Sequence, residues 1–283
     1  MMGTSLDDFR SLPFWKAVFA EFLGTLLLVM LGIGSTVQGW EKDSQDVVQI
    51  ALSFGVTVAT AIWIIGHISG GHINPAVTWA MFITRKISFL KTILFFLVQS
   101  LGAIAGAGLL YAMTPADQVG SLGCTTLNIG MTTGKAFGVE FFLTFVLVLT
   151  VFASCDPHRK DLGGSFPLTI GLSVTIGHLW AVQYTGASMN PARSLGPAVV
   201  METWTDHWVY WVGPLAGASV AGLLYDNLLA KNASLLKVRN CLMTADYDDS
   251  KYKSKAVKIT LLEENGIDME PAGGGDPGIS DTM

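Results

Sequence analysis

Charged residues are scarce in this chain. Asp, Glu, Lys and Arg make up 14% of its 283 residues, hydrophobic residues make up 51%, and the mean hydropathy is +0.48. A soluble domain carries about 25% charged residues, so the composition excludes an ordinary soluble protein and indicates a membrane protein. The formal net charge of -5 gives no sign of nucleic-acid binding.

Cysteine is also scarce. Cys124, Cys155 and Cys241 are far apart, odd in number and in no C-x-x-C spacing, which argues against a disulfide framework. His67 and His72 flank a glycine-containing loop and fit that loop better than a metal pair. No nucleophile–base set or phosphate-binding loop is visible either. We therefore expect no metal, no cofactor and no enzymatic activity.

Six hydrophobic segments are long enough to cross a bilayer, which takes about 20 mainly apolar residues. The segments are 15–37, 47–65, 91–113, 135–154, 166–182 and 207–230. The preceding residues, 1–14, lack a signal-peptide pattern, and the polar residues 231–283 are expected to be a largely disordered tail. The sequence thus predicts an all-α polytopic membrane protein, with residues 15–230 as one membrane domain.

The triplet Asn-Pro-Ala occurs twice between these segments. Asn is a preferred helix N-cap and Pro is favoured at the first helical position. Each copy is followed by only about ten helical residues, roughly 15 Å or half a bilayer. Two re-entrant half-helices are therefore predicted. The copies are Asn74, Pro75 and Ala76, then Asn190, Pro191 and Ala192.

The two halves of the chain repeat. Residues 108–111 recur as residues 222–225, an offset of 114, and the two triplets are offset by 116. Each repeat, about 15–113 and 135–230, holds three spans, so the second must enter the bilayer upside down relative to the first. The half-helices should then dip in from opposite faces and meet near the midplane, N-terminus toward N-terminus.

Lysine and arginine favour one side of this six-span topology, which predicts that both termini are cytoplasmic. That side carries Arg10, Lys16, Arg85, Lys86, Lys91, Arg159, Lys160, Lys231, Lys237 and Arg239. The other side carries Lys42, Lys135 and Arg193.

Asn74 and Asn190 are the main pore candidates. One copy alone would be explained as a plain N-cap, but two symmetric copies favour a role in a pore as well. A capping Asn uses its side-chain oxygen on the backbone and leaves its NH2 group free for the pore. Two such amides would donate to one passing water, which could then not accept from its neighbours, and a proton wire would be interrupted. The facing helix ends would also repel cations.

Other polar residues lie at membrane depth. Arg193 follows the second triplet and is expected to be functional rather than a snorkelling side chain. His178 in the fifth span is compatible with a core role or a pore role. Glu21 and Glu140 occupy equivalent repeat positions, and we favour them as acceptors for the free N–H groups of the re-entrant loops over a proton relay.

With its doubled motif in a six-span inverted repeat, the chain from about residue 10 to 230 resembles the aquaporins of the major intrinsic protein family. It is similar to the animal water-selective branch, and to the red-cell type above all. The resemblance implies a right-handed bundle of six helices and two half-helices. It also implies a homotetramer in the plasma membrane, with a pore in every subunit.

The resemblance implies specific pore residues as well. Phe54, His178 and Arg193 would form the extracellular selectivity filter. Backbone carbonyls would form an acceptor ladder at Gly70, Gly71, His72 and Ile73, and at Gly186, Ala187, Ser188 and Met189.

Two positions favour water over glycerol as the expected solute. Glycerol-conducting relatives usually have Asp after the arginine, where this chain has Ser194, and a smaller residue in place of His178. The red-cell type has a pore cysteine at the filter position that Ala187 occupies here, so weak inhibition by mercurials is expected.

The predicted function is a passive, proton-excluding channel in the lipid bilayer with water as the permeant. A glycerol or small-solute facilitator and a membrane-junction or scaffold protein with low conductance remain alternatives. An ion channel or proton-coupled transporter is disfavoured by the opposed helix ends, and no nucleic-acid partner is expected.

Overall fold

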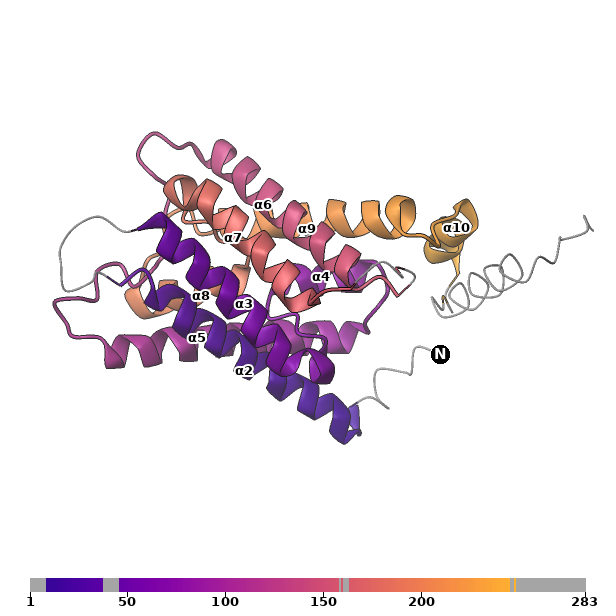
Figure 1. Ribbon diagram of the computed structural model, residues 1–283, viewed down its shortest axis with the longest axis horizontal. Helices are drawn as coiled ribbons and strands as arrows, with labels where there is room; N and C mark the ends of the chain where they lie inside the picture. Colours follow the sequence, from indigo (N-terminus) through magenta and orange to yellow (C-terminus); the bar gives the residue numbers. More distant parts are fainter. Residues whose placement is uncertain (1–8, 38–45, 158, 160–162, 245–246, 248–283) are drawn as a thin grey trace, which may run out of the picture. The chain divides into compact units, whose positions relative to one another are not determined.

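The computed structural model describes residues 9–37, 46–157, 159, 163–244 and 247. Within these ranges every regular element is helical (Figure 1), so the predicted all-α class is confirmed. Two of the loop charges used for the orientation, Lys42 and Lys160, lie outside the described residues.

Six long helices match the six predicted spans. They are α2 (Leu12–Gly34), α3 (Val47–Ser69), α5 (Phe89–Met113), α6 (Thr133–Ser154), α7 (Phe166–Thr185) and α9 (Val209–Leu224), which continues into the π-helical turn η1 (Tyr225–Leu229). By length and composition alone, α2, α3, α5 and α6 can cross a membrane. Helix α3 runs four residues beyond its predicted end, because a left-handed Gly70 with φ 99° caps it only there.

The two predicted half-helices are present. Helix α4 (Pro75–Ile83) has nine residues and α8 (Pro191–Met201) has eleven. Asn74 is the N-cap of α4 and accepts a hydrogen bond from the Ala76 N–H, and Asn190 caps α8 in the same way. The sequence signal for each start, an N-cap Asn followed by Pro, therefore gives the expected local structure.

Each half-helix packs mainly against the third span of the opposite repeat. Helix α4 lies on α9, and α8 lies on α5. Within each repeat the first span packs on the second and third, as α2 does on α3 and α5, and as α6 does on α7 and α9. The repeats are consequently interlocked, and neither can enclose a pathway alone.

Small residues set the close approaches between long helices. A Cβ on Gly102 would collide with the backbone oxygen of Phe22 in α2, and one on Gly217 would collide with that of Phe141 in α6. Gly55 and Gly171 stand against each other in the same way where α3 crosses α7. At these glycines the helix backbones approach each other more closely than a larger residue would allow.

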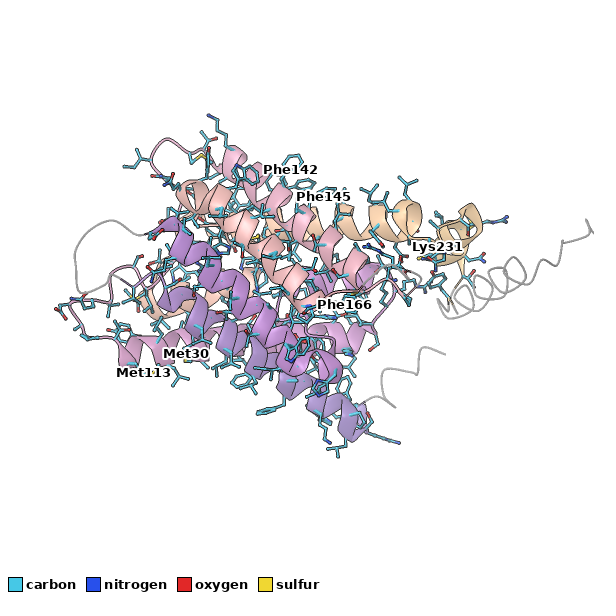
Figure 2. The ribbon with its side chains drawn as sticks, viewed as in Figure 1. Met30, Met113, Phe142, Phe145, Phe166 and Lys231 are labelled. Carbon is cyan, nitrogen blue, oxygen red and sulfur yellow. The ribbon has the colours of Figure 1, made fainter. Side chains whose placement is uncertain are left out.

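The outside of the bundle is apolar, as a bilayer requires. Phe142, Phe166 and Met113 project from the helices with relative exposures of 57%, 42% and 65% (Figure 2). Inside, the buried residues form one large cluster that draws on both repeats.

A short helix occupies part of the tail for which the sequence predicted disorder. Helix α10 (Leu235–Met243) begins after the N-cap Ser234. Its Lys237 is buried and donates to the carboxylate of Asp226 at 3.1 Å, while Arg85 donates to the Cys241 carbonyl at 3.0 Å. Nothing in the sequence signalled this helix, because the pairing of a buried lysine with η1 is not visible in local composition; that the tail is largely disordered stays a prediction. Residues 248–283 lie outside the described part of the chain.

Candidate functional site

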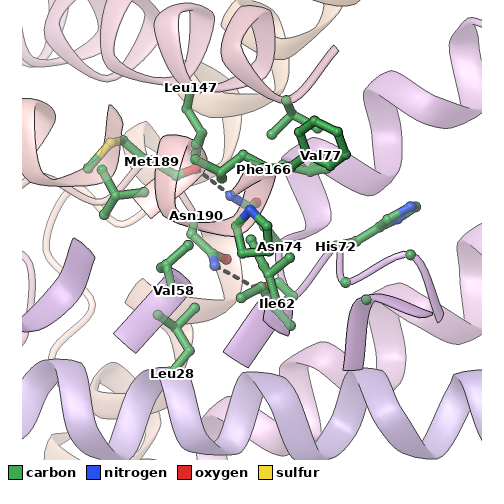
Figure 3. Close-up of a pocket in the computed structure, with 18 of the residues that line it drawn as sticks. Leu28, Val58, Ile62, His72, Asn74, Val77, Leu147, Phe166, Met189 and Asn190 are labelled. Carbon is green, nitrogen blue, oxygen red and sulfur yellow. Dashed lines mark hydrogen bonds between the residues drawn. The ribbon is translucent and has the colours of Figure 1, made fainter. Parts of the chain in front are cut away.

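The half-helix starts meet in a reciprocal pair of hydrogen bonds. The Asn74 side-chain nitrogen donates to the Met189 carbonyl at 2.8 Å, and the Asn190 side-chain nitrogen donates to the Ile73 carbonyl at 2.8 Å (Figure 3). Each asparagine oxygen still caps its own helix. Thus each repeat supplies the acceptor for the other repeat's asparagine.

This pairing differs from the sequence expectation. The prediction left both amide hydrogens of each asparagine free for the pore, but one of the two is used by the opposite loop. An amide nitrogen carries two hydrogens, so each asparagine retains one donor. The local triplet could not reveal the carbonyl partner, which lies more than a hundred residues away in sequence.

Both re-entrant loops contain residues in the left-handed region that are not glycine. Ile73 has φ 46°, Ala187 has φ 51° and Met189 has φ 55°. For a β-branched residue such as Ile73 this conformation is unusual, and it costs on the order of 1–3 kcal/mol. The surrounding contacts must hold the loops in this shape.

The first loop is held by Glu21, which is fully buried. Its Oε1 accepts from the His72 N–H at 2.8 Å and from the Ser69 hydroxyl at 2.6 Å. Its Oε2 accepts from the Ile73 N–H at 2.6 Å and from the Gln99 side-chain nitrogen at 2.8 Å. All four contacts are donors, so the group acts as an acceptor only, as an ionised carboxylate does.

The second loop is held in the same way by Glu140. This carboxylate is also fully buried. Its Oε1 accepts from the Ser188 N–H at 2.9 Å and from the Thr185 hydroxyl at 2.6 Å. Its Oε2 accepts from the Met189 N–H at 2.9 Å. The two carboxylates therefore satisfy the N–H groups that the irregular loops leave unpaired at membrane depth.

A cavity of 590 Å³ runs beside the meeting point. One wall is apolar and the other consists of the loops and the two asparagines (Figure 3). The apolar wall includes Leu28, Val58, Ile62, Leu147 and Val174. The loop wall includes Gly70, Gly71, His72, Ile73, Asn74, Ser188, Met189 and Asn190.

Phe54, His178 and Arg193 line the same cavity and lie close together. The rings of Phe54 and His178 lie 4.2 Å apart, and the Arg193 guanidinium lies 4.8 Å from the Phe54 ring centre. Their relative exposures are only 1%, 1% and 3%. The three residues come from α3, α7 and α8, so this constriction is assembled from both repeats.

A model of the major intrinsic protein family matches residues 8–225. The chain belongs to this family.

Curated members of the family are similar over most of the chain. Aquaporin-4 of Mus musculus is 55% identical over 225 residues, which cover 78% of this chain and 70% of the relative. Aquaporin-4 of Homo sapiens is 56% identical over 216 residues, covering 75% and 67%. The lens fiber major intrinsic protein of Lithobates pipiens is 50% identical over 222 residues, covering 78% and 84%. The particular likeness to the red-cell type stays a prediction.

A solved structure has the same fold. The aquaglyceroporin from Plasmodium falciparum superposes with a TM-score of 0.70 at 26% identity, covering 76% of this chain and 96% of that one. Major intrinsic proteins are membrane channels, so the six helices, the half-helices and the cavity of this chain have a common explanation.

In this family member the constriction offers both an acceptor and donors. His178 Nδ1 lies 2.9 Å from the Val174 carbonyl, which can only accept, so the proton of the neutral ring is on Nδ1 and Nε2 is an acceptor. The Arg193 guanidinium donates to the Gly123 carbonyl at 2.7 Å. Within the described residues, His178 Nε2 and Arg193 Nε have no protein partner.

A second cavity of 430 Å³ shares Arg193 with the first. It is lined by the loop around Gly123 and Cys124 and by Gly186. Ala187 is fully buried and lines neither cavity, although the resemblance placed it in the filter.

Sequence reasoning missed several polar residues behind the loops. Gln99 contacts Glu21, Thr125 donates to Ser194 at 2.8 Å, and Tyr210 donates to the Thr185 carbonyl at 2.9 Å. A glutamine within an otherwise apolar span was a usable signal, because a polar group at that depth needs a partner.

Proposed function

We propose that this chain is a passive water channel that excludes protons and ions. The observation that carries the proposal is the reciprocal asparagine pair beside a cavity that Phe54, His178 and Arg193 also line. The similarity to aquaporin-4 over most of the chain supports the same function. Water moves down an osmotic gradient, and no covalent step is involved.

Proton exclusion follows from the remaining hydrogen of each asparagine. A water between Asn74 and Asn190 accepts from both amides and turns its own hydrogens outward. It cannot accept from a neighbouring water, so the hydrogen-bonded wire changes direction there. The two half-helices also point their N-termini, which carry about half a positive charge each, toward this place. Cations, including hydronium, are repelled.

The constriction selects the solute. Arg193 offers donors and a positive charge, and His178 offers an acceptor on the facing side. Phe54 limits the width between them. A water molecule satisfies both polar groups at once, whereas a larger polyol needs the volume that the His178 ring fills. We therefore assign water, rather than glycerol, as the permeant.

The membrane setting belongs to the proposal as well. Basic residues gather at the ends of α4 and α10, where Lys86 and Lys237 both contact Asp226. The positive-inside rule places this side, and hence both termini, in the cytoplasm. Family membership supports a homotetramer in the plasma membrane, with residues 15–230 as the channel domain of each subunit.

The test is stopped-flow light scattering of proteoliposomes that contain the purified full chain. We expect fast osmotic water efflux with a low activation energy, no glycerol uptake and no proton leak. The double variant His178→Gly, Arg193→Val should admit glycerol, whereas Lys135→Val, which removes an exposed charge, should not. Slow efflux from well-folded wild-type protein would refute the proposal, and an unchanged double variant would remove both residues from the filter.

A further inference from the structure

The side chain of His72 is fixed by partners outside the water pathway. His72 lines the 590 Å³ cavity, and its ring is directed away from Asn74 and Asn190 (Figure 3). Its Nδ1 lies 3.0 Å from the Thr78 hydroxyl oxygen. Phe95 packs edge-on against the ring, with 5.4 Å between centroids. Only Nε2 is left for the pathway.

The Gln99 amide determines which groups donate and which accept in these hydrogen bonds. Its nitrogen donates to Glu21 Oε2 at 2.8 Å and to the Thr78 hydroxyl oxygen at 2.9 Å, which uses both amide hydrogens. Its own oxygen is buried and has no protein partner among the described residues. The opposite amide orientation would place that oxygen against a carboxylate, so Glu21 fixes the orientation.

Thr78 must then donate to His72. Its oxygen accepts from Gln99, and its hydroxyl hydrogen is left for His72 Nδ1. Thr25 and Thr144, by contrast, donate to the carbonyl four residues back in their helices, each at 2.8 Å. Since Nδ1 accepts, the proton of a neutral His72 ring is on Nε2.

We propose that Gln99 is a positioning residue of the water pathway, which acts through Thr78 to hold His72 with its Nε2–H facing the cavity. The inference rests on the proposed water-channel function. It places a hydrogen-bond donor among backbone carbonyls that can only accept, so water in this half of the path has partners of both kinds. It also assigns opposite tautomers to the two pathway histidines, His72 and His178.

The second repeat supports the role of this arrangement. Ser188 and Ser194 occupy the positions equivalent to His72 and Thr78, two residues before and four residues after the capping asparagine. Their hydroxyl oxygens lie 2.6 Å apart, and Thr125 donates to Ser194 as Gln99 donates to Thr78. Both half-helix starts are thus bridged by a side-chain pair that a third residue orients.

The amide also separates Glu21 from the water. Gln99 donates in both directions, to the carboxylate and to Thr78, and an amide nitrogen does not hand on a proton as a hydroxyl or imidazole does. The hydrogen-bonded chain from Glu21 to His72 therefore orients the ring without offering the carboxylate a proton path into the cavity.

The experiment is solid-state NMR of the full chain in proteoliposomes, with ¹⁵N-labelled histidine. The His72 signals are assigned by their loss in His72→Gln. Wild-type His72 should show a protonated Nε2 and a hydrogen-bonded, unprotonated Nδ1, while His178 shows the reverse. In Gln99→Met the Nδ1-protonated fraction of His72 should rise about fivefold, because one neutral hydrogen bond no longer biases the two tautomers. Thr78→Ser, which keeps the hydroxyl, should retain the wild-type pattern.

The His178 signals serve as an internal control and should not change in any variant. A proton on Nδ1 of neutral wild-type His72 would overturn the inference even if Gln99→Met does not fold. A folded Gln99→Met protein with the wild-type His72 signals would overturn it too. Fast water efflux alongside either result would leave the water-channel function standing, whereas slow efflux with the expected tautomers would refute only that function.

Discussion

Replacing Glu140 by Gln should weaken the second re-entrant loop by a predictable amount. The carboxylate oxygens meet only donors: two at Oε1, and the Met189 N–H at Oε2. The new NH2 group must replace one of these oxygens. The less costly choice is Oε2, which leaves the Met189 N–H without an acceptor and adds amide hydrogens that face another donor.

Each buried polar group without a partner costs about 1–3 kcal/mol. Two such groups, the Met189 N–H and the new amide, give a destabilisation of about 2–6 kcal/mol. For a chain of this size, 1 kcal/mol corresponds to roughly 2–4 °C in the melting temperature. The variant should melt many degrees below wild type and conduct less water per channel, since the loop at Ser188 and Met189 loses its fixed shape.

The assay is thermal unfolding of purified protein in detergent, followed by intrinsic tryptophan fluorescence at one scan rate, with water efflux from proteoliposomes measured in parallel. Glu202→Gln makes the same chemical change on the exposed C-cap of α8 and should leave both measurements at wild-type values. A Glu140→Gln protein that melts and conducts like wild type would show that the carboxylate does not hold the loop.

Two further predictions concern packing and thiol chemistry. Gly217→Ala should destabilise the protein by about 1–3 kcal/mol, because the new Cβ meets the Phe141 backbone rather than a movable side chain; Gly138→Ala, whose Cβ would enter open space, is the control in the same melting assay, and equal melting temperatures would contradict the packing explanation. Burial raises the pKa of the Cys124 thiol, which lines the second cavity, so less thiolate is present at neutral pH. On the proposed topology, block of water efflux by an external, membrane-impermeant mercurial should be weak at pH 7, grow as the pH rises and disappear in Cys124→Ser. Strong block at pH 7 that survives this substitution would refute the assignment.

The half-helices could be predicted because their signal is local. An N-cap Asn followed by Pro fixes where α4 and α8 begin, and a short apolar run fixes how far they reach. Glu21 and Glu140 were recognisable for a similar reason. A carboxylate in a spanning helix needs hydrogen-bond donors, and a re-entrant loop has backbone N–H groups that need acceptors.

The partners across the bundle could not be predicted in the same way. Nothing near Asn74 identifies the Met189 carbonyl as its acceptor, and nothing near Gln99 shows that one amide contacts both Glu21 and Thr78. The left-handed backbone of Ala187 is not signalled by an alanine either. Likewise, Lys237 looks like a solvated charge in a polar tail until its contact with Asp226 is seen.

The exchange of hydrogen bonds between the two loops has a consequence for biosynthesis. Asn74 emerges from the ribosome long before Met189, the residue whose carbonyl completes its hydrogen bonding. During that interval the first half-helix has neither this acceptor nor α9, the helix it later packs against. The final placement of the first re-entrant segment should therefore wait until α8 and α9 have been synthesised.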